Sequence, residues 1–138
     1  MPHRTTTTQR LRSAGLRPTQ QRIALANLLF AEGYRHFTAE ELHHEATQRG
    51  FALSVATVYN TLSQFTEAGL VRTLAVEGAR TWYDTNVADH HHFFVEGSGE
   101  ILDVPGSHIK IDNLPEPPDG FEIANVDIVI RLRPLPFN

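Results

Sequence analysis

The strongest constraint on the fold is a change of hydrophobic pattern near residue 70. Before it, four segments space their apolar residues as helices do, and each is followed by a glycine, at Gly15, Gly33, Gly50 and Gly69. A glycine just past a helical period ends a helix, because it adopts the left-handed conformation without steric cost. After it, the runs are short, β-rich and bounded by turn residues. We therefore expect an α+β fold with the helices first.

The first two helices are predicted over residues 5–14 and from Pro18 to the segment before Gly33. Proline suits the first turn of a helix, since its missing N–H would have no partner there. Apolar spacing predicts that the second helix is well buried. Its expected inner face comprises Ile23, Ala26, Asn27 and Phe30, widened by Leu25, Leu28 and Leu29.

The next two helices carry their own start signals. Thr38 is a good N-cap with Glu41 three residues later, a capping box, and Leu42 and Ala46 mark the inner face. Ser54 caps the fourth helix, whose expected inner face is Val55, Val58, Leu62 and Phe65.

A β-hairpin is predicted directly after the fourth helix. The runs "LVRTLAV" (70–76) and "RTWYDT" (80–85) are separated by the short turn "EGA". Helices followed by a hairpin are the order of a winged helix-turn-helix, which presents its last helix to the DNA major groove.

The second half reads as three strands, "HFFVEG" (92–97), "GEILDV" (99–104) and "FEIANVDIVIRL" (121–132). The segment 105–120 carries four prolines and can hold a short helical turn at most. We expect a winged-helix domain over 1–86 and a small α/β dimerisation domain over 87–138. The apolar residues of its last strand are too many for so small a unit to bury alone, so it should pair with a second copy.

Charge is distributed unevenly along the chain. The net charge is −4, yet residues 1–86 hold nine Arg against seven Asp and Glu, and the acidic excess lies in the second half. This asymmetry favours a basic module that binds nucleic acid, although an arginine-rich solvated face would give the same numbers. No cysteine is present, which excludes disulfides and thiolate metal sites. Without a signal peptide or a long apolar run, the expected location is the cytoplasm.

Three consecutive histidines, His90 to His92, begin the second half. Alternate residues of a strand share a face, so His90 and His92 would point together and His91 the other way. Two imidazoles on one face are half a site for Zn²⁺, Fe²⁺ or Mn²⁺. Asp84 and His36 are candidates for the remaining ligands. The alternative is that the histidines simply face solvent while Phe93 and Phe94 enter the core.

The chain resembles the Fur family of metal-responsive bacterial transcription regulators. The matching stretches are "GLRPTQQR", "HFTAEEL", "ATVYNTLSQFTEAGLV", the histidine cluster and "GEILDV". Within the family it is most similar to the iron response regulator branch, which typically lacks cysteine pairs and carries three histidines followed by aromatics.

The resemblance implies a dimeric regulator, not an enzyme, that binds palindromic operators and responds to iron status through haem, controlling genes of haem synthesis and iron homeostasis. It implies one divalent metal (Fe, Mn or Zn) per subunit on His36, Asp84, His90 and His92. Haem would be held by His90, His91 or His92, and His91, on the face opposite the metal ligands, is the best candidate. The DNA-contacting residues would be Arg17, Ser54, Thr57, Tyr59 and Asn60.

Two other functions stay open. One is a different branch of the same family, sensing manganese, zinc or peroxide. A second metal site of the family would need a histidine where Val126 stands. The other is a small cupin-like metalloenzyme built on the histidines, which the helical, basic first half disfavours.

Overall fold

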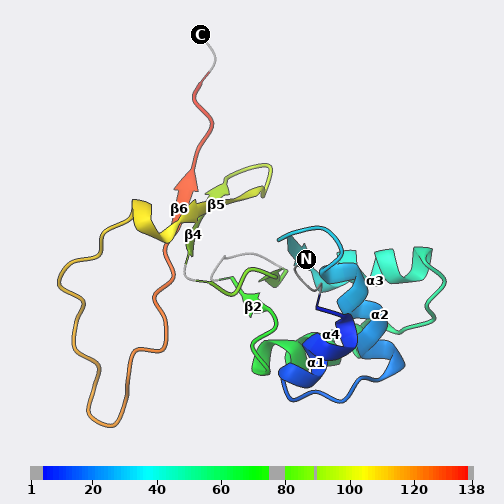
Figure 1. Cartoon of the computed structure of the whole chain (residues 1–138). Coiled ribbons are helices and arrows are strands. Elements are labelled where there is room, and N and C mark those ends of the chain that lie inside the picture. Colours follow the sequence, from blue (N-terminus) through cyan, green and yellow to red (C-terminus); the bar gives the residue numbers. More distant parts are fainter. Residues whose placement is uncertain (1–4, 75–79, 89, 137–138) are drawn as a thin grey trace. The chain divides into compact units, whose positions relative to one another are not determined.

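The computed structural model describes residues 5–74, 80–88 and 90–136. These residues form two compact units, one reaching to Val87 and the other starting at Ala88. The first contains α1 (Thr7–Ser13), α2 (Gln20–Leu29), β1 (His36–Thr38), α3 (Ala39–Gln48), α4 (Val55–Glu67), β2 (Arg72–Thr73) and β3 (Trp82–Asp84). The second contains β4 (His90–Val95), β5 (Ile101–Pro105), the 3-10 turn η1 (Gly106–His108) and β6 (Val129–Leu132). This order confirms the predicted α+β class (Figure 1).

Each helix of the first unit starts at a polar cap. The side chains of Thr6, Thr19, Thr38 and Ser54 each accept a hydrogen bond from the backbone N–H three residues later, which satisfies a donor that has no partner within the helix. Thr19 therefore caps α2, and Pro18 precedes the cap instead of lying in the first turn as predicted. Helix α2 starts later than predicted because the Thr19 hydroxyl can accept the capping hydrogen bond and the ring of Pro18 cannot.

Glycines end α3 and α4 as expected. At Gly50 (φ 85°) and Gly69 (φ 80°) the chain turns left-handed. The next residue's N–H then bonds back across the helix end, from Phe51 to Ala46 and from Leu70 to Phe65. His43 Nε2 also donates to the Leu53 carbonyl at 2.8 Å, which ties α3 to the segment that leads into α4.

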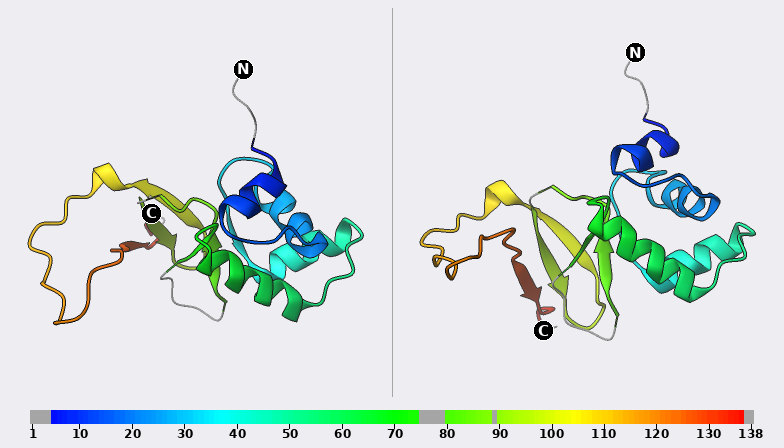
Figure 2. Two further views of the ribbon diagram at one scale, coloured as in Figure 1. Left: turned by 60° about the horizontal axis from the view of Figure 1, so that its bottom comes forward. Right: turned by 90° about the horizontal axis from the view of Figure 1, so that it is seen from below.

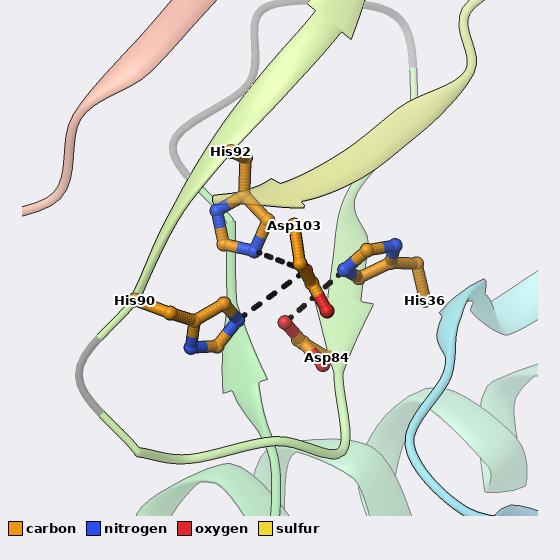
Figure 3. A group of neighbouring side chains, drawn as sticks. All are labelled: His36, Asp84, His90, His92 and Asp103. Carbon is orange, nitrogen blue, oxygen red and sulfur yellow. Dashed lines mark ion pairs between the residues drawn. The ribbon is translucent and has the colours of Figure 1, made fainter. Parts of the chain in front are cut away.

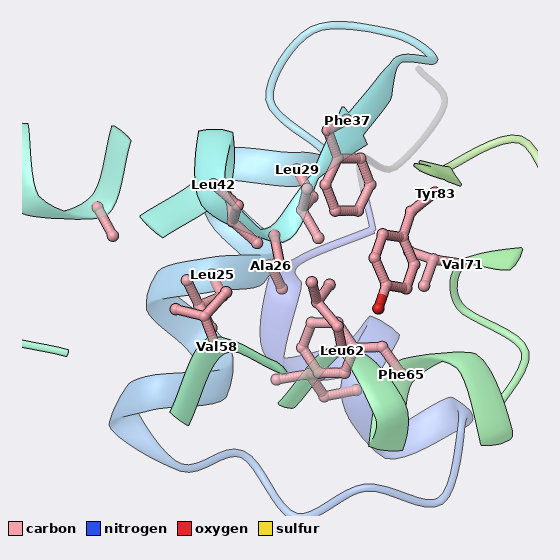
Figure 4. Packing of buried hydrophobic residues seen from close by; sticks show 13 residues of the cluster. Leu25, Ala26, Leu29, Phe37, Leu42, Val58, Leu62, Phe65, Val71 and Tyr83 are labelled. Carbon is pink, nitrogen blue, oxygen red and sulfur yellow. The ribbon is translucent and has the colours of Figure 1, made fainter. Parts of the chain in front are cut away.

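The core of the first unit is formed by the helices and by two aromatic side chains of the sheet (Figure 4). The predicted inner faces are wrong at two residues: Val55 is 40% exposed and Asn27 is exposed. Ala24 and Thr61 are buried instead, and the Thr61 hydroxyl donates to the Thr57 carbonyl, so it enters the core without an unmet hydrogen bond. Among the described residues, no helix combines the length and the hydropathy needed to cross a bilayer.

The first sheet has the order β1-β3-β2, with both pairings antiparallel. Strands β2 and β3 are the two arms of the predicted hairpin, and its turn lies outside the described residues. Strand β1 was not predicted. It pairs His36 with Asp84 and Phe37 with Tyr83, whose rings stack with centroids 5.4 Å apart.

The second sheet has β4 at its centre, antiparallel to β5 and parallel to β6 (Figure 2). The last predicted strand, 121–132, is too long: only Val129–Leu132 is a strand. Its ladder with β4 starts at His92↔Val129, and β4 itself starts only at His90, so residues further back have no partner strand. The segment between η1 and β6 is irregular, and η1 is the short helical turn that the prolines allow.

Two valines of α4 test this packing with the same substitution. Val58 is fully buried and Val55, one turn earlier, is 40% exposed. Val58→Ala should lower the free energy of unfolding by about 2–3 kcal/mol, through lost burial and a residual cavity. Val55→Ala should change it by less than about 0.5 kcal/mol. Urea denaturation followed by circular dichroism measures both, and equal effects would contradict the assigned inner face.

Candidate functional site

One group of metal-ligand side chains lies in the first unit, where β1 pairs with β3. His36 and Asp84 are directly opposite, and His36 Nε2 lies 3.2 Å from Asp84 Oδ2. The side chain of Asp84 is 1% exposed, and its other oxygen accepts the N–H of Asn86 at 2.9 Å. A carboxylate this buried is stable only when it is paired with hydrogen-bond donors or a cation.

A second group lies in the second unit, on β4 and β5. His90 Nε2 and His92 Nε2 lie 3.5 and 3.4 Å from the same Asp103 oxygen, Oδ1. The two imidazole rings are 4.6 Å apart, edge to face. His90 and His92 are buried, and strand pairing places Asp103 opposite His92. Figure 3 draws both groups, with dashed lines for the ion pairs.

The hydrogen bond on the far side of His90 determines what its Nε2 can do. Nδ1 lies 2.6 Å from the Ala88 carbonyl, which can only accept, so Nδ1 carries a proton. In the neutral ring Nε2 then presents a lone pair, directed at a carboxylate oxygen that also has only lone pairs. Two acceptors face each other stably when a proton or a cation lies between them.

The spacing of these atoms fits a first-row metal ion. With bonds of about 2.1 Å, neighbouring ligand atoms lie roughly 3.0–3.4 Å apart at octahedral to tetrahedral angles. The ligand-atom pairs measure 3.2–3.5 Å. Nδ1 of His90 bonded to a backbone carbonyl is the usual outer contact of a metal-binding histidine. Either group can thus contribute donors to a divalent cation.

Asp103 was missed by the sequence analysis. It belongs to "GEILDV", eleven residues after His92, and only the β4–β5 register brings the two together. Its position was deducible in principle, because an antiparallel partner strand must place one side chain opposite each histidine.

His91 points to the other face of β4, as the alternation predicts. Its Nδ1 accepts the Ile128 N–H at 3.2 Å, so the proton of the neutral ring lies on Nε2. A ring in this state has no free lone pair with which to ligate haem iron. Among the described residues His91 also borders a hollow lined largely by apolar side chains of the segment between η1 and β6.

The predicted DNA-contacting residues lie in the first unit, on and beside α4. Asn60 and Arg17 are exposed. Ser54 and Thr57 hydrogen-bond to each other at the start of α4 through their hydroxyl groups. Arg22 was given no role by the sequence: its guanidinium donates to the Arg17 carbonyl and to Gln64 of α4, which fixes the backbone that carries Arg17.

Tyr59 differs from an ordinary exposed contact residue. It is half-buried, and its hydroxyl donates to the carboxylate of Glu40 in the first turn of α3. This hydrogen bond is the main cause that lowers the pKa of Glu40 and raises the pKa of Tyr59.

The chain is similar to curated repressors. It is 36% identical over 93 residues to the peroxide-responsive repressor PerR of Staphylococcus epidermidis, covering 67% of this chain and 61% of that protein. It is 31% identical over 116 residues to PerR of Staphylococcus aureus strain Mu50, covering 83% of this chain and 78% of the repressor.

Solved structures show the same fold. The ferric uptake regulator of Pseudomonas aeruginosa with manganese superposes with a TM-score of 0.73 at 25% identity, covering 93% of this chain and 97% of that one. The ferric uptake regulator of Vibrio cholerae gives a TM-score of 0.69 at 23% identity, over 91% and 98% of the two chains. The model of the ferric uptake regulator family matches residues 13–131. The chain therefore belongs to the ferric uptake regulator family of metal-responsive transcription regulators.

Proposed function

We propose that this protein is a dimeric transcription regulator whose operator affinity depends on one divalent metal ion per subunit. The ion is held by His36 and Asp84 of the first unit and by His90, His92 and Asp103 of the second. The observation that carries the proposal is the convergence of ligand atoms: Nε2 of His90 and of His92 lie within 3.5 Å of the same Asp103 oxygen, with Nδ1 of His90 bonded to a backbone carbonyl.

The two ligand groups complete one another. His36 and Asp84 supply two ligands, and the second group supplies three, while Mn²⁺ and Fe²⁺ sites commonly take five or six ligands. The chain from Asp84 to His90 is six residues long, so their Cα atoms are at most about 22 Å apart in any arrangement of the units. A shared ion is thus within reach of both groups.

Three imidazoles and two carboxylates favour Fe²⁺ or Mn²⁺ over Zn²⁺. Zinc in protein sites is usually four-coordinate, and carboxylate-rich sets suit manganese and ferrous iron. Regulation by iron status, the predicted signal, fits this donor set. Iron binding would change DNA affinity because ligands from both units restrict how the winged helix is held relative to the rest of the chain.

Dimerisation is supported by the second unit. Its described residues bury few apolar side chains, chiefly Ile101 and Val104, while Leu114, Phe121 and Ile123 are each more than 45% exposed. Exposed apolar groups on a unit with so small a core favour burial against a second copy. A two-fold dimer would then read a palindromic operator in the cytoplasm.

The peroxide-responsive repressors among the relatives support a second candidate, a peroxide sensor. One test distinguishes a peroxide sensor from a regulator of iron status. In a peroxide sensor, hydrogen peroxide should abolish operator binding by the Fe²⁺ form and leave binding by the Mn²⁺ form unchanged. In a regulator of iron status, this difference should be absent. Haem ligation by His90, His91 or His92 stays a prediction, against which the His91 geometry argues, and a haem titration by absorbance tests it.

One shared metal centre predicts equal damage from ligands in either unit. Asp84→Asn and Asp103→Asn should each weaken Mn²⁺ binding at least about 100-fold, since each removes a charged ligand. Asp112→Asn, an exposed carboxylate of the second unit, is the control and should bind as wild type does. Calorimetric titration gives affinity and stoichiometry. Normal binding by Asp84→Asn would mean that the second group acts alone.

DNA binding predicts a specific role for Arg17. An operator is first selected from a random duplex pool with the Mn²⁺-loaded protein. Arg17→Ala should then weaken binding by about 1–3 kcal/mol and reduce the salt slope by about one, because one cation near phosphate is lost. Arg49→Ala, the same change at the end of α3, should have little effect. Operator affinity is measured by fluorescence anisotropy. Equal losses of affinity for Arg17→Ala and Arg49→Ala would show that only net charge matters.

The dimer predicts sensitivity at exposed apolar positions of the second unit. Sedimentation should give twice the 15.5 kDa chain mass at micromolar concentration. Ile123→Asp and Ile130→Asp should shift the protein toward monomer, because a charge would be buried at the interface. Ser107→Asp, which adds the same charge at an exposed polar residue of the unit, is the control. A wild-type monomer that binds the operator tightly would contradict the dimer.

A further inference from the structure

The hydroxyl of Tyr59 has one proton, and its position limits what this residue can recognise. Tyr59 lies on α4, the helix proposed to enter the major groove, and its hydroxyl is bonded to Glu40 Oε1. Glu40 belongs to α3, which packs against α4 within the same unit. The pair therefore joins α3 and α4, while the ring of Tyr59 packs against the core of the unit.

The shared proton belongs to Tyr59. The hydrogen bond from Tyr59 holds the pKa of Glu40 below its usual value, and the same bond keeps the phenol protonated by raising the pKa of Tyr59. Glu40 also lies in the first turn of α3, where the helix dipole favours a negative charge. An ionised carboxylate only accepts hydrogen bonds, so Tyr59 is the donor.

A second observation strengthens this assignment. The other oxygen of the carboxylate, Oε2, is buried and has no hydrogen-bond partner among the described residues. The Tyr59 hydroxyl is the largest of the interactions that lower the pKa of Glu40, ahead of a backbone hydrogen bond, the Arg80 charge and Thr38, so the carboxylate retains this donor strongly. Tyr59 is thus held in one orientation, with only its oxygen lone pairs available to a further partner.

We propose that Glu40 is a positioning residue that makes Tyr59 a hydrogen-bond acceptor toward DNA, so that Tyr59 selects a base with a major-groove amino group. Adenine N6 and cytosine N4 are the amino donors of the major groove, whereas guanine O6, thymine O4 and phosphate oxygens only accept. The proposal rests on the proposed DNA-binding function and adds a base preference to it. It also means that this hydroxyl makes no phosphate contact.

The experiment uses the full-length, Mn²⁺-loaded protein and the operator selected from a random duplex pool. Wild-type affinity is measured on operators in which single adenines or cytosines are replaced by purine or 2-pyrimidinone, which lack the amino group. One replacement should weaken binding roughly three- to tenfold, as expected for one hydrogen bond. This arm needs no protein variant, so it cannot fail through misfolding.

Two variants then test whether Tyr59 and Glu40 cause the preference for an amino group at that operator position. Tyr59→Phe should abolish the penalty for the missing amino group. Glu40→Gln should reduce it and admit guanine or thymine there, because an amide can donate to the Tyr59 oxygen and release its proton toward DNA. Glu41→Gln, the neighbouring exposed carboxylate of the same turn, should keep the wild-type preference. A purely structural role of Glu40 would change overall affinity without changing the preference at one position.

The outcomes distinguish failure of this proposal from failure of the proposed DNA-binding function. The proposal is overturned if no amino group in the operator matters, if Tyr59→Phe keeps the penalty, or if Glu40→Gln keeps the full preference while Tyr59→Phe loses it. Failure of the wild-type protein to select any sequence would instead overturn the proposed DNA-binding function.

Discussion

The antiparallel pairing of β1 with β3 is the constraint on which the first unit depends. It places Phe37 against Tyr83 in the core and His36 opposite Asp84 at the proposed metal site. The same three-residue strand ends at Thr38, whose hydroxyl caps α3. One short strand thus connects packing, a helix start and the ligand geometry, so damage to it should affect stability and metal binding together.

The second unit depends on the two faces of β4. One face directs His90 and His92 toward Asp103, and the other directs His91 to the Ile128 backbone. Because the period of a strand is two residues, a shift of one residue would exchange these roles. The histidine triplet therefore combines two proposed metal ligands with one structural side chain that attaches the segment before β6.

Local signals made most of the fold predictable, while long-range pairing did not. Threonine and serine caps and terminal glycines located the helices, and strand alternation separated His91 from its neighbours. Strand β1 has no periodicity of its own and exists because β3 offers it an edge. Asp103 became a candidate ligand only through the β4–β5 register, and the last strand was overpredicted because its partner starts at His90. Glu40 escaped notice since a first-turn glutamate ordinarily faces solvent.

In the proposed regulator, one metal centre couples the two units to DNA affinity. The most direct measurement is the linkage between Mn²⁺ and the selected operator: operator affinity with and without Mn²⁺, and Mn²⁺ affinity with and without operator. The account predicts that Mn²⁺ tightens operator binding and that the operator tightens Mn²⁺ binding by the same factor, since coupling free energy is reciprocal. Operator affinity that is unchanged by saturating Mn²⁺ would contradict it.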